Sequence, residues 1–169
     1  MSQIQDRLNE LLEYRDGKVY WKVDRGSQKC KGKEAGTDHG RGYKALRIRE
    51  LGGAMLLHRA IWAMHYGDLP ETLDHINGNK NDNRIENLRP ATRVQNGYNR
   101  AGTSLNTTGV KNVSWVKRNK KWGVNISVNG KRKWIGLFED LELADLVAQE
   151  ARHKYHGQYA HHGVQNVRD

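Results

Sequence analysis

The stretch from residue 72 to residue 100 constrains this chain more than any other, because it combines ligand-type side chains with an unusual density of asparagine. Asp74 and His75 are adjacent, so a carboxylate stands beside a side chain that titrates near neutral pH. Asparagine favours turns because its side chain satisfies nearby backbone groups. We therefore expect residues 77–87 to form one compact, self-bonded loop. The asparagines that distinguish this stretch from its surroundings are Asn77, Asn79, Asn83, Asn87, Asn96 and Asn99.

The composition allows only a modest core. Hydrophobic residues make up 36% of the 169 residues, and a single Phe leaves five Trp and seven Tyr to supply the large apolar surfaces. A chain of this length accommodates one ordinary domain or two small ones. The formal net charge of +10 points to a polyanionic partner.

The cysteine content and the hydropathy pattern exclude several classes of protein. Cys30 is the single cysteine, so a disulfide framework and a zinc site built from Cys pairs are both excluded, and no structural zinc is expected. The first residues form no apolar signal region, and no apolar run approaches membrane-spanning length. We expect an intracellular, cytoplasmic protein with no membrane partner.

The residues before the Asn-rich stretch predict a small mixed domain. Apolar residues from Ile4 to Leu12 share one helical face, which indicates a helix from Ser2 to near Tyr14. Asp16-Gly17 is a hairpin turn signal before a strand. The expected elements are then a strand at residues 18–23, an exposed basic loop at 24–42, a strand at 43–49 and a helix at 56–66.

His58 and Arg59 open the last of these helices. Packing at the start of the helix is the preferred interpretation for His58. For Arg59, both a packing role and a phosphate contact remain open.

The Asn-rich stretch resembles the HNH endonuclease family, whose core is a hairpin and a helix around one divalent metal, the ββα-metal fold. The resemblance rests on residues 74–79, on residues 83–89, and on Thr92 followed by Asn96. It places the first His of the family on His75, the middle Asn on Asn87 and the last position on Asn96, where many members have His.

This resemblance implies a set of roles. Asp74 and Asn96 would be the metal ligands, His75 the general base, and Asn87 the brace that joins the loop ends and orients His75. Hard oxygen ligands suit Mg²⁺, so a divalent metal is expected, Mg²⁺ first, with Mn²⁺ or another divalent ion left open. The candidate phosphate contacts in this stretch are Lys80, Arg84, Arg89 and Arg93.

Strand geometry restricts how Asp74 and His75 can act together. Neighbours on a regular strand point to opposite faces, so both cannot address one phosphate from a flat strand. A bulge, or a strand that ends at His75, is required. The alternative treats residues 72–100 as an Asn-rich turn with a solvated His. The ordered set of motif residues favours the nuclease interpretation.

The segment from Gly109 onward predicts a second, smaller domain. Asn129-Gly130 is a strong signal for a two-residue hairpin turn. Residues 121–128 alternate between apolar and polar, so one face of the sheet should be buried under an alanine-bearing helix. The expected strands are 111–117, 121–128 and 131–138, and the expected helix is 141–156.

The same segment carries eight basic residues and no acidic residue between Asn106 and Phe138, which indicates a nucleic-acid-binding sheet. It looks like the DNA-binding domain of the plant ethylene-response-factor (APETALA-two) family, on Gly109-Val110, Trp115, Lys121-Trp122 and residues 134–138. In that family the sheet enters the major groove. For Trp115 and Trp134, packing in the core and contact with DNA are equally expected. The residues expected to contact DNA are Lys111, Trp115, Lys117, Lys121, Asn125, Ser127, Arg132 and Trp134.

Taken together, these features predict an α+β protein. A ββα-metal HNH nuclease domain at residues 1–100, with its catalytic core at about 72–100, would precede a small three-stranded antiparallel sheet packed on one helix. A linker at 101–108 would lead to the sheet domain at 109–160 and a tail at 161–169. The expected activity is metal-dependent hydrolysis of double-stranded DNA by a homing-type enzyme.

The expected enzyme works as a monomer, with a dimer left open. One active site favours nicking, and the domain pair is typical of phage-borne mobile endonucleases, which would place the protein in the cytoplasm of the host cell. The alternative function is a DNA-binding regulator that keeps a catalytically silent HNH scaffold.

Overall fold

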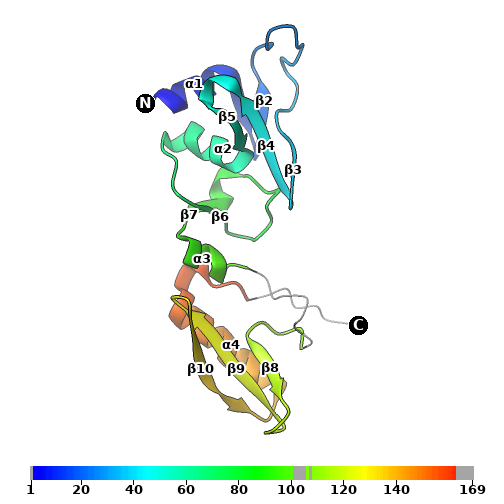
Figure 1. Cartoon of the computed structure of the whole chain (residues 1–169), viewed down its shortest axis with the longest axis vertical. Coiled ribbons are helices and arrows are strands. Elements are labelled where there is room, and N and C mark those ends of the chain that lie inside the picture. The colour runs from blue at the N-terminus through cyan, green and yellow to red at the C-terminus, as the bar shows by residue number, and fades with distance from the viewer. Residues whose placement is uncertain (1, 101–105, 107, 163–169) are drawn as a thin grey trace. The chain divides into compact units, whose positions relative to one another are not determined.

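The computed structural model describes residues 2–100, 106 and 108–162 (Figure 1). The chain divides into two compact units, Met1–Ala91 and Thr92–Asp169. Most of the expected linker at 101–108 and of the expected tail at 161–169 lies outside the described residues. Among the helices that the structure describes, none has both the length and the apolar character needed to cross a membrane.

The first unit begins with a helix followed at once by a hairpin. Helix α1 spans Gln3–Leu11, and the Ser2 hydroxyl caps it by accepting from the Gln5 amide. The expected extension of this helix to Tyr14 is wrong, because Leu12 is extended and pairs with Trp21. Strands β1 (Leu12–Arg15) and β2 (Lys18–Trp21) follow. Both turn residues between them have positive φ, which confirms the Asp-Gly turn.

A three-stranded antiparallel sheet in the order β3-β4-β5 comes next. Its strands are β3 (Thr37–Gly40), β4 (Tyr43–Ile48) and β5 (Gly53–Leu56), with the short helix η1 (Arg49–Leu51) before β5. Strand β3 falls in the segment expected to be a basic loop. Its four residues are all exposed, so they carry none of the apolar alternation by which a strand is recognised.

Helix α2 (Leu57–Tyr66) forms the centre of the first unit. Seven of its residues are buried, and it ends at Gly67 in the left-handed conformation. Leu73 and Leu88, from the hairpin described next, are buried in the same core, so this hairpin is anchored against α2 and its neighbours. The fully buried large side chains of this core are Leu8, Leu12, Val19, Ile48, Leu57 and Ile61.

The unit closes with a second hairpin, built from β6 (Leu73–His75) and β7 (Leu88–Pro90). The strands pair antiparallel, with Asp74 opposite Arg89. The connecting loop ends in the short helix η2 (Ile85–Asn87). This hairpin contains the Asn-rich loop.

The second unit begins with helix α3 (Arg93–Tyr98), closed at its start by a capping box between Thr92 and Gln95. Strands β8 (Val113–Val116), β9 (Lys121–Val128) and β10 (Lys131–Phe138) form an antiparallel sheet in the order β10-β9-β8. Helices α4 (Leu141–His156) and η3 (Gly157–Tyr159) complete the described part.

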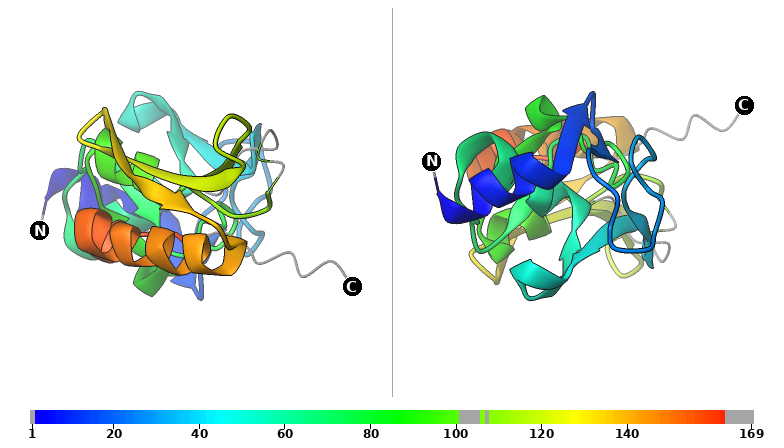
Figure 2. Two further views of the ribbon diagram at one scale, coloured as in Figure 1. Left: turned by 90° about the horizontal axis from the view of Figure 1, so that it is seen from below. Right: turned by 90° about the horizontal axis from the view of Figure 1, so that it is seen from above.

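Helix α4 runs along one side of this sheet (Figure 2). Ala144 and Ala148 of the helix have no exposed surface and pack with Val113 and Val124 of the sheet. Small side chains let the helix and the strands approach closely, while the opposite face of the sheet has no helix over it within the described residues of this unit.

Candidate active site

Strand β6 ends at His75, which is one of the two arrangements that strand geometry requires for adjacent Asp74 and His75. The amide of Gly78 donates to the carbonyl of His75 at 2.8 Å, and Gly78 adopts a positive φ of 73°. A tight turn therefore starts directly after His75. His75 itself still belongs to β6 and pairs with Leu88, so the strand changes direction only after this residue.

The Asn-rich loop is bonded to itself, as expected. The Asn87 carboxamide accepts from the Asn77 amide at 3.0 Å and donates to the Asn77 side-chain oxygen at 3.0 Å and to the Asp82 carbonyl at 2.7 Å. One buried side chain thus joins the two ends of the loop. The Tyr14 hydroxyl accepts from the Ile85 amide at 3.1 Å, which also ties the loop to β1.

His75 is buried and held by a neighbour in this loop. Its Nε2 lies 3.0 Å from Oδ1 of Asn83, and both side chains are less than 5% exposed. Because an amide oxygen only accepts, this contact places the ring proton on Nε2. Burial lowers the pKa of His75, and the bond to Asn83 opposes that shift. Nδ1 is then the basic nitrogen of a neutral ring.

His58 brings a second imidazole against His75. The ring centroids lie 5.0 Å apart in an edge arrangement, and Tyr43 tilts against both rings at 5.5 and 6.2 Å. Burial, followed by the charges of His75 and Arg59, lowers the pKa of His58 to about 3. The expected packing of His58 at the start of α2 is confirmed. Its partner is the candidate base His75, and no spacing in the sequence indicates that contact.

Arg59 holds the chain that leads into β6. Its Nη1 donates to the carbonyls of Pro70 at 2.8 Å and Glu71 at 3.3 Å. These bonds position the segment between α2 and Asp74. The packing role that was left open for Arg59 therefore has direct structural support.

Asp74 is buried and forms an ion pair with Arg89 on the facing strand. Oδ2 of Asp74 accepts from Nε at 2.9 Å and from Nη2 at 2.7 Å, and the side chains are 4% and 13% exposed. The pair follows from the strand register. Arg89 therefore orients the candidate metal ligand.

Three candidates of the nuclease motif remain, Arg84, Arg93 and Asn96. Arg84 is bound to Asp82 at 2.8 Å, and this guanidinium holds the pKa of Asp82 far below its usual range. Arg93 and Asn96 belong to α3 in the second unit. The sharing of one cation by Asp74 and Asn96 remains a prediction.

A metal site at Asp74 and Asn96 would have only two protein ligands. Within the described ranges no three His, Cys, Asp or Glu side chains are grouped as metal ligands. A carboxylate and a carboxamide oxygen are nevertheless the hard donors that Mg²⁺ accepts, with substrate oxygens and waters completing its shell. The donor chemistry therefore fits a divalent cation.

In the second unit, the register places several candidate DNA contacts on the face of the sheet opposite α4. Asn125 pairs with Trp134 and Ser127 with Arg132, and Nε of Arg132 donates to the Asn125 oxygen at 2.7 Å. Trp134 is 54% exposed and lies over Gly123, where an added Cβ would stand 2.7 Å from the indole ring. We name this surface the open face; it comprises Lys121, Gly123, Asn125, Ser127, Arg132 and Trp134.

Two other candidates lie elsewhere. Trp115 pairs with Trp122, with ring centroids 4.8 Å apart, so it lies on the face that α4 covers. The Lys111 amine donates to the carbonyls of Tyr98 at 2.7 Å and His161 at 3.0 Å, and burial lowers its pKa to about 8. Trp115 is nevertheless 45% exposed, and the carbonyl contacts of Lys111 are ones that the sequence did not indicate. Lys117 lies in the turn between β8 and β9.

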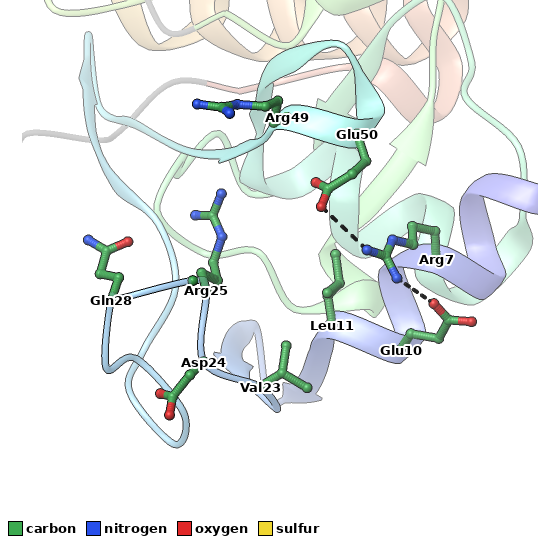
Figure 3. Close-up of a pocket in the computed structure, with 10 residues that line it drawn as sticks. Arg7, Glu10, Leu11, Val23, Asp24, Arg25, Gln28, Arg49 and Glu50 are labelled. Atoms are coloured by element: carbon green, nitrogen blue, oxygen red, sulfur yellow. Dashed lines mark hydrogen bonds and ion pairs between the residues drawn. The ribbon is translucent and has the colours of Figure 1, made fainter.

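A groove of about 580 Å³ lies in the first unit beside α1 and η1 (Figure 3). Arg7 crosses part of it, bonded to Glu10 at 2.7 Å and to Glu50 at 3.4 Å. None of the hairpin residues line it, so the groove is separate from the candidate base.

Comparison with known proteins identifies a family match that includes the hairpin and helix α3. Residues 55–98 match the HNH endonuclease family model. The chain is 32% identical to Protein 3.8 of Escherichia phage T7 over 107 residues, which is 61% of this chain and 86% of that protein. It is 43% identical over 65 residues to Uncharacterized HNH endonuclease L560 of Acanthamoeba polyphaga mimivirus, covering 37% of this chain and 34% of that protein.

No solved structure matches the chain. The chain therefore belongs to the same family as Protein 3.8 of phage T7, and its residues 55–98 form an HNH endonuclease domain.

Proposed function

We propose that this protein is a metal-dependent endonuclease that hydrolyses phosphodiester bonds in double-stranded DNA. The observation that carries the proposal is the environment of His75. This imidazole is buried, is oriented by Asn83 and stands at a strand end next to Asp74, inside the region that matches the HNH model. A neutral, oriented imidazole is the group that a general base requires.

His75 would act through Nδ1. That nitrogen takes a proton from the attacking water, the water oxygen forms a bond to phosphorus, and the bond from phosphorus to the 3′ oxygen breaks. The departing 3′ oxygen takes a proton from solvent. The products would carry a 3′-hydroxyl and a 5′-phosphate.

Asp74 and Asn96 would hold the divalent cation, Mg²⁺ or Mn²⁺. When bound, such an ion supplies positive charge to the phosphate and to the departing oxygen. Arg89 keeps the Asp74 carboxylate in one orientation, and Asn87 keeps the loop closed around His75. Arg84 and Arg93 are proposed as phosphate contacts.

The open face of the second unit is proposed as the DNA-binding surface, with Lys117 beside it. It combines an exposed indole, a guanidinium and two small polar side chains, which suits contact with base edges and phosphates. One active site per chain favours nicking of one strand in each encounter. A homing-type role follows from this pairing of a nuclease domain with a separate DNA-binding sheet.

A DNA-binding regulator with a silent HNH scaffold is the rival function. The ion pair between Asp74 and Arg89 favours it, because the candidate ligand already has a cationic partner. Incubation of duplex DNA with the protein and Mg²⁺ distinguishes the two. The nuclease predicts nicks that DNA ligase reseals and none in EDTA, whereas the regulator predicts binding without any product.

A further inference from the structure

The ring of His75 needs more than its hydrogen bond to keep one orientation. Its backbone pairs with Leu88 in β6, and its Nε2 lies 3.0 Å from Oδ1 of Asn83. One hydrogen bond fixes one atom of the ring and lets the plane pivot about it. The rotation of a histidine ring about its last side-chain bond has broad energy wells, so rotamer preference does not fix the plane either. The direction of Nδ1 therefore depends on the groups that pack against the ring.

Two aromatic rings from other elements pack against His75. Tyr43 is the first residue of β4, and its ring centroid lies 6.2 Å from that of His75 and 5.5 Å from that of His58. The ring centroid of His58, the second residue of α2, lies 5.0 Å from that of His75. Aromatic rings in contact have centroids about 4.5–7 Å apart, so each of the three rings touches the other two. A pivot of the His75 plane is therefore opposed by both neighbours.

Tyr43 is itself held by the Asn-rich loop. Nζ of Lys80 lies 4.6 Å from the Tyr43 ring centroid and donates to the Arg41 carbonyl at 3.0 Å. A cation within about 6 Å of a ring centroid is attracted by the ring. Lys80 and Asn83 belong to the same loop, so this loop holds His75 directly through Asn83 and indirectly through Tyr43. The phosphate contact expected of Lys80 stays a prediction.

We propose that Tyr43 and His58 are positioning residues for His75. Their rings keep the imidazole plane in one orientation, so that Nδ1 meets the attacking water while Asn83 keeps the proton on Nε2. Neither side chain takes part in the proton transfer. This inference rests on the proposed function. It extends the hydrolytic machinery to β4 and α2, which lie outside the hairpin that carries His75.

The test compares full-length variants at Tyr43. Tyr43→Ala removes the ring, Tyr43→Leu keeps apolar bulk without a flat ring, and Tyr43→Phe removes the hydroxyl alone. Tyr20→Ala is the matched control, because Tyr20 is also half-buried on a strand of the first unit and has a cation, Arg15, 4.9 Å from its ring centroid. His58→Ala and His58→Phe repeat the comparison at the second ring.

Four measurements separate positioning from folding. Nitrogen-15 NMR of the metal-free protein shows which ring nitrogen of His75 carries the proton, and thermal unfolding shows whether a variant is folded. Duplex affinity in EDTA and the single-turnover cleavage rate with Mg²⁺ separate binding from chemistry.

The parent should carry the His75 proton on Nε2. Tyr43→Ala and Tyr43→Leu should share it between the two ring nitrogens and cleave about 10- to 100-fold more slowly, because a small displacement of a catalytic group can cost about 100-fold. Their duplex affinity should stay unchanged, and Tyr43→Phe and Tyr20→Ala should match the parent. His58→Ala should behave like Tyr43→Ala, with His58→Phe between it and the parent.

A folded Tyr43→Ala or Tyr43→Leu protein that cleaves as fast as an active parent, with the proton still on Nε2, would overturn the inference and leave the proposed function standing. Equal losses in Tyr20→Ala or in Tyr43→Phe would overturn it as well, because such losses would not depend on the Tyr43 ring. A parent that carries the proton on Nε2 and never cleaves would instead refute the proposed function, and with it the catalytic meaning of these ring contacts.

Discussion

The imidazole rings of His58 and His75 meet edge to face, with their centroids 5.0 Å apart, in the buried part of the first unit. His58 therefore cannot take a proton without placing a charge beside the candidate base. Burial, followed by the charges of His75 and Arg59, lowers the pKa of His58 to about 3.

Acid should destabilise the first unit through His58. The unfolded chain binds a proton at His58 near pH 6.5, whereas the folded chain does so only near pH 3. Between these values the unfolded state binds more protons, so the free energy of unfolding falls as pH falls, by up to about 1.4 kcal/mol per pH unit. His58→Phe should flatten this slope in denaturant unfolding. Exposed His39→Phe should keep it, and an unchanged slope in His58→Phe would contradict the assignment.

Asn83 should matter for catalysis and not for DNA binding. Asn83→Ala removes the acceptor that holds the proton on Nε2 of His75. We expect the cleavage rate to fall by roughly 10- to 100-fold, part of what a positioned base contributes. Asn81→Ala, an exposed change in the same loop, is the control for single-turnover kinetics. Equal rates for Asn83→Ala and the parent would show that His75 is not oriented by this bond.

The two arginine–aspartate pairs of the hairpin should differ in their effect on stability. Arg89→Ala leaves the buried Asp74 carboxylate without its main cation, which typically costs about 3–5 kcal/mol. Arg84→Ala removes a guanidinium that is 47% exposed, so unfolding should change little. Chemical denaturation of the two variants measures the difference. An equal loss of unfolding free energy in the two variants would contradict the larger contribution assigned to the buried pair.

Variants of Trp134 should lose DNA affinity, whereas a variant of Trp115 should lose stability. The Cβ of Gly123→Ala would stand 2.7 Å from both the Trp134 ring and Cγ2 of Val116, so these side chains must shift. Gly123→Ala should therefore weaken binding to a labelled duplex as Trp134→Ala does, and the double variant should add nothing further. Trp115→Ala removes a ring packed on Trp122, and should lower the melting temperature while leaving affinity intact. Loss of affinity in Trp115→Ala alone would place the DNA on the other face.

Elements with a strong local pattern could be predicted from the sequence. Residues 121–128 alternate, Asn129-Gly130 supplies a turn with positive φ, and alanines mark the buried side of α4; the strands and the helix follow these signals. Strand β3 has no such pattern, because all of its side chains are exposed. The end of α1 depends on the pairing of Leu12 with Trp21, which local propensity does not encode.

The site was predictable in its composition but not in its contacts. The order of Asp74, His75 and Asn87 indicates the motif, and the loop bonds of Asn87 follow from its turn-forming chemistry. The pairing of Arg89 with Asp74 depends on strand register across the whole loop. The ring of His58 reaches His75 only through the packing of α2, and the carbonyl partners of Lys111 arise from tertiary structure alone.

Nicking of supercoiled plasmid by the parent and by His75→Ala, each with Mg²⁺ or with EDTA, tests the proposed activity most directly. The parent should convert plasmid to open circle with Mg²⁺ and not with EDTA, while His75→Ala should bind the DNA and fail to nick it. A parent that binds plasmid but yields no open circle with Mg²⁺ or Mn²⁺, or a His75→Ala variant that nicks as fast as the parent, would contradict the account.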